Sequence, residues 1–304
     1  MIFRKHSIRR AVALLWCASC LTVAANARPK EAGAETAASV VATDSKRALQ
    51  LIAFKQTIRR GLFLHVFTPD PGMFPGPRPA IIFFHGGGWT EGDALRFYDQ
   101  ARHLADKGMV AVSADYRIGQ VDGTDPRAAL SDAISAMRYL RVHAGMLNID
   151  PARIAAGGGS AGGQLAAALA TSQGFEDPAD DQRVSYRPSA LVLFNPVIDN
   201  GPDGFGRDRV AGYWQAFSPL HNVKRGHPAT LIMLGTRDAL IPVATARAYC
   251  DKVRASGADC RLELYEGQPH AFFARSRSLR YYGETLAAMD AFLGKLGYLA
   301  APGD

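Results

Sequence analysis

The sequence predicts an α/β fold in which a mostly parallel central sheet is flanked by helices and carries small loop or cap insertions. Short, largely unbroken apolar runs alternate with helical patterns, which is typical of parallel strands covered on both faces. With 304 residues, 48 % hydrophobic and 21 % charged, the chain has the composition of a folded globular protein. Its length is sufficient to bury a substantial core.

The strands are expected to begin with an antiparallel pair within residues 55–68, where two β-rich runs flank a turn at 59–61. A loop follows, because residues 69–79 are dense in proline and glycine. The later strands are short apolar runs such as AIIFF, expected at 80–84, 110–113, 153–156, 190–194, 230–234 and 261–265.

The helices are expected between these strands. Residues 125–143 place Ala, Ile, Met and Leu on one face, and the Ala-rich stretch 161–171 follows a glycine turn. Two stretches do not fit the alternation, 174–188 and 199–226; they are rich in Asp, Pro, Gly and aromatic residues, which indicates loops or cap insertions over the sheet. The remaining helices are expected at 97–107, 244–255 and 279–296.

The N-terminal residues have the pattern of a secretory signal. A positive segment, Arg4–Arg10, precedes the 14-residue apolar run Ala11–Ala24 and the small-x-small triplet Ala25–Ala27. The run is shorter than the roughly 20 residues needed to span a bilayer. We therefore predict a signal peptide at 1–27 cleaved near Ala27, a flexible leader at 28–49 and one domain at 50–304. The mature protein is expected to be periplasmic or secreted, without a stable membrane anchor.

Charge and histidine spacing exclude two classes of partner. The formal charge is +7, but four cations lie in the first 27 residues, and the remainder has no clustered basic face of the kind a nucleic-acid-binding protein shows. The histidines are scattered without ligand spacing, so neither a metal nor another cofactor is expected. The sequence carries no signal for an oligomeric state.

Two cysteines remain after the signal peptide, Cys250 and Cys260. An even number of cysteines in an exported protein predicts a disulfide. The alternative is a pair of buried thiols.

The strongest chemical motif is Gly158–Gly162 (GGSAG), which matches G-x-S-x-G between an expected strand and an expected helix. A sharp turn there would present the Ser160 hydroxyl, which needs a base to become a nucleophile. The alternative is a glycine-rich helix start that holds a phosphate, but no Lys or Thr follows as in a Walker motif.

A second glycine motif, His85–Trp89 (HGGGW), follows the strand expected at 80–84. Successive glycines at 86, 87 and 88 leave backbone N–H groups open to an oxyanion. Open α/β sheets bind ligands at the carboxyl ends of their strands, so two glycine motifs at two such ends predict one site.

A catalytic acid and base are expected later in the chain, in the order Ser, Asp, His. Asp238 follows the strand at 230–234 and His270 follows the strand at 261–265. We predict that Asp238 orients His270 and that His270 takes the proton of Ser160. The alternatives are Asp199, Asp203 and Glu266 for the acid, and His85 for the base, although His85 more simply orders the glycine loop.

These motifs resemble the HGGG-type serine esterases of the α/β-hydrolase superfamily, the hormone-sensitive-lipase-like and acetyl- or carbohydrate-esterase members. The resemblance covers about residues 50–297 and implies the triad Ser160, Asp238 and His270, with the N–H groups of Gly87, Gly88 and Ala161 as oxyanion donors beside Gly86. The elbow GGGSAGG lacks the acidic residue common in hormone-sensitive-lipase-like sequences and no helical cap precedes residue 50, which favours the carbohydrate-esterase side over a lipase. The matching segments are HGGGW at 85–89, ADYR at 114–117, DPARIAAGGGSAGG at 150–163, GTRDALIP at 235–242 and GQPHAFF at 267–273.

Aromatic residues near these motifs are candidates for the substrate cleft. Trp89 is predicted to line it, with core packing as the alternative. Four further aromatic residues either form an acyl or sugar platform or pack the 199–226 insertion: Phe205, Tyr213, Trp214 and Phe217.

The sequence thus predicts an exported serine carboxylic-ester hydrolase that works through an acyl-enzyme. The expected substrates are short, acetyl-like esters on a small molecule or a polysaccharide. The alternatives are a lipase, a prolyl-oligopeptidase-like serine peptidase, and a non-catalytic binding protein with the same fold.

Overall fold

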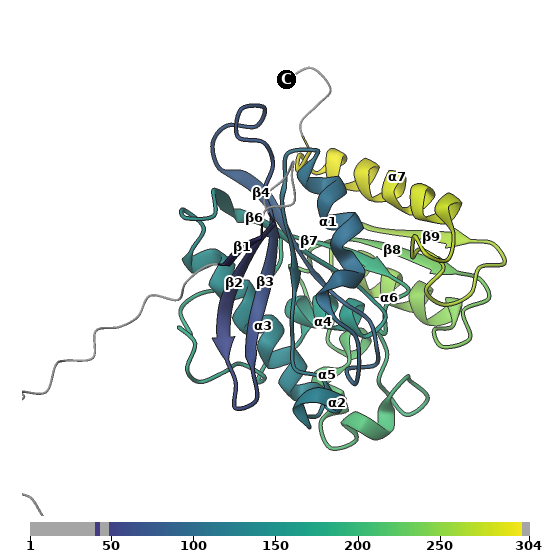
Figure 1. Ribbon diagram of the computed structural model, residues 1–304. Helices are drawn as coiled ribbons and strands as arrows, with labels where there is room; N and C mark the ends of the chain where they lie inside the picture. Colours follow the sequence, from purple (N-terminus) through teal and green to yellow (C-terminus); the bar gives the residue numbers. More distant parts are fainter. Residues whose placement is uncertain (1–39, 43–48, 300–304) are drawn as a thin grey trace, which may run out of the picture. The chain divides into compact units, whose positions relative to one another are not determined.

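A single sheet organises the part of the chain that the computed structural model describes, residues 40–42 and 49–299. Within these residues the sheet has nine strands in the order β1-β2-β3-β5-β4-β6-β7-β8-β9 (Figure 1). The strands are β1 (Val40–Ala42), β2 (Leu49–Gln56), β3 (Gly61–Phe67), β4 (Arg78–Phe84), β5 (Val110–Ala114), β6 (Ile149–Gly159), β7 (Ala190–Phe194), β8 (Ala229–Gly235) and β9 (Cys260–Tyr265).

The sheet is parallel from β5 to β9 and antiparallel at its N-terminal edge. Strands β5, β4, β6, β7, β8 and β9 pair in parallel, whereas β1, β2 and β3 pair in antiparallel fashion and β3 joins β5 in the same way. The predicted mostly parallel sheet is confirmed. All the parallel strands therefore end at one edge, where the predicted site residues follow.

Helices cover both faces of the sheet (Figure 1). Side chains alternate along β4: Ile81 and Phe83 pack in one apolar cluster with α1 and α7, and Ile82 and Phe84 pack in the other with α3, α4 and α6. The five helices are α1 (Tyr98–Ala105), α3 (Pro126–Val142), α4 (Ala161–Thr171), α6 (Val243–Ala255) and α7 (Leu279–Lys295).

Several element boundaries differ from those expected, among them that of β6, which is longer than the strand expected at 153–156. The helix expected at 97–107 is α1, and the short η1 (Ala94–Phe97) lies directly before it. The Asp93 side chain caps η1 by accepting the N–H of Leu95 at 3.0 Å. The predicted leader at 28–49 contains β1, which pairs with β2, and β2 itself begins at 49. The predicted signal peptide at 1–27 lies outside the described residues.

The predicted insertions contain little regular structure. Residues 174–188 have neither helix nor strand, whereas the stretch 199–226 is broken into short turns of helix that the sequence pattern does not predict. These are η2 (Arg207–Val210), α5 (Trp214–Phe217) and η3 (Pro219–His221), and a further short helix, α2 (Gly119–Asp122), follows β5.

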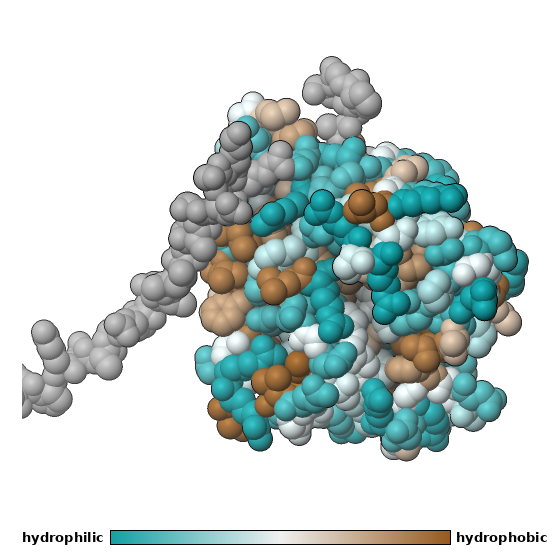
Figure 2. Space-filling model, turned by 45° about the vertical axis from the view of Figure 1, so that its right-hand side comes forward, coloured by the Kyte–Doolittle hydropathy of each residue, from teal (hydrophilic) through white to brown (hydrophobic). Residues whose placement is uncertain are grey.

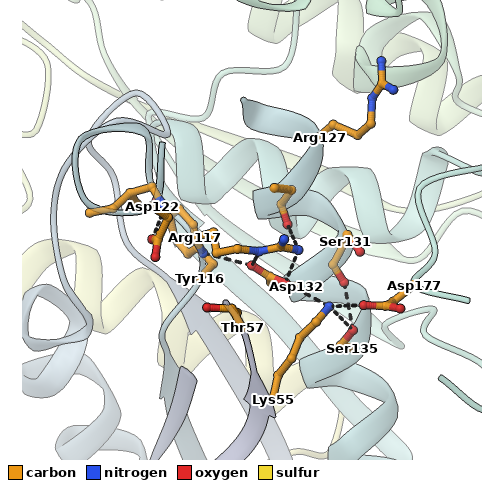
Figure 3. A network of polar contacts seen from close by, with 12 residues as sticks. Lys55, Thr57, Tyr116, Arg117, Asp122, Arg127, Ser131, Asp132, Ser135 and Asp177 are labelled. Carbon is orange, nitrogen blue, oxygen red and sulfur yellow. Dashed lines mark hydrogen bonds and ion pairs between the residues drawn. The ribbon is translucent and has the colours of Figure 1, made fainter. Parts of the chain in front are cut away.

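A buried ion-pair network holds the N-terminal edge of the sheet to α3 (Figure 3). Asp132 of α3 is fully buried. Its carboxylate accepts two hydrogen bonds of 2.7 Å from the Arg117 side chain and forms an ion pair with Lys55 of β2 at 3.0 Å. Lys55 also pairs with Asp177 of the 174–188 insertion at 2.7 Å. A buried carboxylate is costly unless it is paired, so moving any of these elements apart would leave Asp132 without a partner. The contacts therefore hold β2, the end of β5, α3 and the 174–188 insertion together.

On the face that Figure 2 shows, the apolar side chains lie in separate patches with hydrophilic side chains between them. Among residues 49–299, no helix is long and apolar enough to cross a bilayer.

Cys250 of α6 and the first residue of β9, Cys260, form a disulfide. Their Cα atoms are 5.4 Å apart, and both residues are buried. The bond closes a short loop between the segments that carry Asp238 and His270.

We expect Cys250→Ser to lower the melting temperature in oxidising buffer by roughly 5–10 °C. A loop closed by residues 10 apart in sequence restricts the unfolded chain by about 3 kcal/mol on the chain-entropy model. Differential scanning calorimetry with and without a reductant measures the effect, and in reductant the variant and the native protein should converge. Two titratable thiols in the denatured, non-reduced protein starting at Arg28 would contradict the bond.

Candidate active site

Ser160 lies at the turn between β6 and α4 in a strained backbone conformation. Its φ and ψ are 54° and −119°, outside the regions that most residues adopt. The flanking glycines allow this turn to approach β4 closely, since a Cβ on Gly158 would lie 2.5 Å from the Phe84 carbonyl oxygen and one on Gly162 would lie 2.0 Å from it. The strand-turn-helix context required for the G-x-S-x-G motif is therefore present.

A hydrogen-bonded chain joins the three residues of the predicted triad. His270 Nε2 is 3.0 Å from Ser160 Oγ, and His270 Nδ1 is 2.7 Å from Asp238 Oδ2. The Asp238 side chain is fully buried, whereas that of His270 is 20 % exposed. The carboxylate can only accept, so Nδ1 carries the proton and Nε2 is free to accept the serine proton. Among the alternative acids, Asp199 lies 3.6 Å from His221 instead.

Asp238 is itself held by the backbone that follows it. Its Oδ1 accepts the N–H groups of Leu240 at 2.9 Å and Ile241 at 3.0 Å. One carboxylate oxygen thus anchors the turn after β8, and the other faces His270.

The glycine loop after β4 has each of its carbonyl groups engaged. Gly86 O accepts from His85 Nδ1 at 2.9 Å and from Arg96 Nη1 at 3.2 Å, and Gly88 O accepts from Arg209 Nη1 at 2.8 Å. Gly87 O accepts the N–H groups of residues 90 and 91. In a trans peptide the C=O of one residue points opposite to the N–H of the next residue. The N–H of Gly87 therefore faces away from the donors to Gly86 O, and the N–H of Gly88 faces away from the donors to Gly87 O.

These N–H groups belong to a loop packed directly against Ser160. A Cβ on Gly86 would lie 3.3 Å from the Ser160 Cβ, and Gly87 has a φ of 129° at which an added Cβ would lie 2.0 Å from the Glu91 carbonyl oxygen. Ala161 is buried at the first position of α4, where backbone N–H groups have no partner within the helix. The arrangement can place donors on an anion at Ser160.

His85 is positioned to order this loop. It is buried and stacked on Tyr116 with ring centroids 4.2 Å apart, and burial lowers its pKa to about 4. The ring is therefore neutral at neutral pH, donates to Gly86 O, and makes no hydrogen bond with Ser160.

The prediction that Trp89 lines the substrate cleft is wrong. Its side chain is 1 % exposed, its Nε1 donates to Gln164 Oε1 at 3.2 Å, and its ring packs against Phe217. The reason is local: Trp89 follows the glycines with a φ of 59°, which turns the side chain into the core beneath the insertion. Of the four aromatic residues in the 199–226 insertion, Phe205 lines the pocket that contains Ser160 and His270.

Asn195 is a site residue that the sequence analysis missed. It is buried directly after β7 with a φ of 35°, its Nδ2 lies 3.3 Å from His270 Nε2, and its Oδ1 accepts the N–H of Ala271 at 3.1 Å. The available signal was its position, because Asn195 follows a parallel strand at the same edge as Ser160 and His270. It fixes the start of the loop that carries the histidine ring.

The site opens into a pocket of about 680 Å³. Gly86, Ser160, Asn195, Phe205 and His270 all contribute to its wall. Within the described residues, no group of three or more His, Cys, Asp or Glu residues is placed to hold a metal ion.

Arg209 connects the 199–226 insertion to the glycine loop, so Arg209→Met should lower kcat about tenfold while changing KM little. The methionine keeps the apolar stem but releases the Gly88 carbonyl, which lies in the peptide directly after the Gly88 N–H, so the glycine loop loses a contact that holds this residue in place. Steady-state kinetics on a soluble ester measure the split, and Arg209→Lys should restore part of kcat. The matched control is Arg207→Met, because that guanidinium lies over Trp214 at 5.4 Å. Equal losses in both variants would contradict a specific role for Arg209.

Known proteins share this architecture. The BD-FAE family model matches residues 64–202. Among solved structures, apo Thermogutta terrifontis esterase 2 is 36 % identical with a TM-score of 0.80, over 84 % of this chain and 97 % of that one. Propionate- and butyrate-bound forms of the same esterase match with a TM-score of 0.79.

Curated relatives are more distant. An AB hydrolase superfamily protein of Schizosaccharomyces pombe is 27 % identical over 70 % of this chain and 69 % of its own length. An acetylxylan esterase of Xylanibacter ruminicola is 26 % identical over 64 % of this chain, which spans only 41 % of that relative.

The sheet order, the helix layers and the strand-turn-helix at Ser160 define the class of protein as an α/β-hydrolase. Within this superfamily, the chain belongs to the esterases. The 36 % identity with a solved esterase, over 84 % of this chain and 97 % of that one, shows this. The chemistry is carboxylic-ester hydrolysis.

Proposed function

We propose that the protein is an exported serine carboxylesterase that removes short acyl groups, acetyl above all, through an acyl-enzyme. The observation that carries the proposal is the hydrogen-bonded chain from Ser160 Oγ through His270 to Asp238. In this proposal Ser160 is the nucleophile, His270 is the general base and acid, and Asp238 orients the imidazole. The N–H groups of Gly87, Gly88 and Ala161 are the oxyanion donors.

The reaction proceeds in two balanced halves. Ser160 Oγ attacks the ester carbonyl as His270 Nε2 takes its proton, and the tetrahedral oxyanion collapses when His270 gives that proton to the leaving alkoxide. Water then repeats the sequence on the acyl-enzyme, releases the carboxylic acid and restores Ser160.

The pocket and the neighbours support short acyl groups. The pocket lining is mixed, with charged and polar residues such as Glu91, Arg96 and Asn195 beside aromatic ones such as Phe97 and Phe273. The solved esterase binds propionate and butyrate, and one curated relative is an acetylxylan esterase. The acetylxylan esterase favours an acetyl ester on a polysaccharide as the substrate.

Export is supported by the signal-like sequence before Arg28 and by the disulfide, because disulfides persist in oxidising compartments. The protein recovered from the periplasm of a Gram-negative host should begin at Arg28.

A series of p-nitrophenyl esters tests the acyl range. We expect kcat/KM to be highest between acetate and butyrate and to fall at least tenfold at chains of ten carbons, because a long apolar chain would remove water from charged groups of the lining such as Glu91 and Arg96 without pairing them. Acetylated xylan and a chromogenic dipeptide complete the panel. A rate that rises steadily with chain length would favour a lipase, and cleavage of the dipeptide alone would favour a peptidase.

A further inference from the structure

Three arginines lie around the pocket that contains Ser160 and His270. Arg96 comes from η1, and Arg275 and Arg277 come from the loop that begins directly after the histidine. The acidic residues that line the same pocket are two, Glu91 and Asp99. Among the charged groups of the pocket wall, the arginines therefore outnumber the carboxylates by one.

The carboxylates engage two of these arginines only loosely. Arg96 lies 3.7 Å from Glu91 and Arg275 lies 3.7 Å from Asp99, against about 2.7–2.9 Å for a strong charge-assisted bond. All four side chains are about half exposed, and ion pairs of this kind contribute little stability. Exchanging such a partner for a substrate anion costs the protein little.

Arg277 has no carboxylate partner within the described residues. Its Nη1 donates to the His270 carbonyl oxygen at 3.4 Å, which leaves its other N–H groups unused by that contact. A guanidinium in this state, exposed at the pocket wall, is suited to bind a carboxylate through two parallel hydrogen bonds.

We propose that the site selects esters whose alcohol portion carries an anionic group, which Arg277 and Arg275 bind with Arg96 nearby. This inference rests on the proposed function. His270 gives its proton to the leaving oxygen, and Arg277 Nη1 contacts the His270 carbonyl oxygen, so the proposal places these cations on the side of the leaving alcohol. The anion is a carboxylate of either a sugar acid or an aromatic acid.

Two matched substrate pairs test the proposal and separate the sources. One pair is 3-acetoxybenzoate and 3-acetoxybenzamide, and the other is an O-acetylated methyl glucuronoside and the corresponding methyl glucoside. The measured quantity is the anion-to-neutral ratio of kcat/KM, divided by the same ratio for hydroxide-catalysed hydrolysis. We expect a normalised ratio of ten or more for at least one pair, and the pair with the larger ratio identifies the alcohol.

The double variant Arg275→Gln/Arg277→Gln should lower this ratio at least tenfold, and added salt should lower it in the native protein. The double variant Arg225→Gln/Arg247→Gln is the charge-matched control, because both arginines are exposed and lie outside the pocket lining, and it should leave the ratio unchanged. A normalised ratio near one, or an equal effect of the control, overturns this inference alone. Absence of hydrolysis of all four esters while p-nitrophenyl acetate is still hydrolysed also overturns this inference alone. Absence of hydrolysis of p-nitrophenyl acetate as well overturns the proposed function and this inference with it.

Discussion

Replacement of Ser160 by alanine is expected to lower kcat for short esters by about three orders of magnitude or more. The hydroxyl supplies the atom that forms the acyl-enzyme, and no other residue can replace it at the end of the His270–Asp238 chain. The fold should persist, because alanine occupies no more space than serine and meets the same strain at a φ of 54°.

Steady-state kinetics and thermal unfolding of this variant give the two readouts. A fluorophosphonate followed by peptide mapping should label Ser160 in the native protein and nothing in the variant. Ser185→Ala is the control, since Ser185 is an exposed serine in the 174–188 insertion. Retention of more than one hundredth of the native kcat by Ser160→Ala would show that another group is the nucleophile.

The order and spacing of the motifs account for how much of this site is predictable from sequence. Ser160, Asp238 and His270 each follow a strand of the parallel sheet, and parallel strands place their carboxyl ends at one edge. The glycines at 86–88 are predictable for a steric reason, because only residues without a Cβ allow the loop to pack against Ser160 and Glu91.

Other features depend on contacts between distant segments, and sequence patterns do not record those. Trp89 points into the core because its φ is positive, and nothing in HGGGW distinguishes that orientation from one toward the cleft. Arg209 reaches Gly88 from 121 residues away. Strand β1 is only three residues long, so it has no measurable periodicity and is specified by its pairing with β2.

Asn195 combines a feature that the sequence shows, its position, with one that only the structure shows, its contacts. Its place after β7 is readable, but its role follows from the hydrogen bonds to the His270 loop. The triad is thus supported by two turns at neighbouring strand ends: Asn195 holds the backbone of the loop, and Asp238 holds the imidazole. The contact of Asp238 with His270 has the larger effect on catalysis, because it determines which ring nitrogen bears the proton.

Asp238→Asn should therefore lower kcat by about four orders of magnitude with little effect on folding. In the native protein, Oδ1 accepts the N–H groups of Leu240 and Ile241, while Oδ2 faces His270 Nδ1. The amide oxygen of asparagine is bound to take over the two backbone donors, so its NH₂ group faces Nδ1. A donor there requires the imidazole to carry its proton on Nε2, and such a ring cannot accept the proton of Ser160.

The measurements are kcat, the melting temperature and the ¹⁵N chemical shifts of His270, which report the tautomer directly. We expect Nδ1–H in the native protein and Nε2–H in the variant. Raising the pH well above 7 should recover part of the rate, because hydroxide can remove the proton that the misoriented imidazole cannot take. Glu266→Gln is the matched control, an acid-to-amide change at a carboxylate near His270 in sequence but outside its hydrogen bonds, and it should retain native kcat. If Asp238→Asn keeps more than a tenth of kcat, or if both variants lose activity equally, then the orientation of His270 does not depend on this carboxylate.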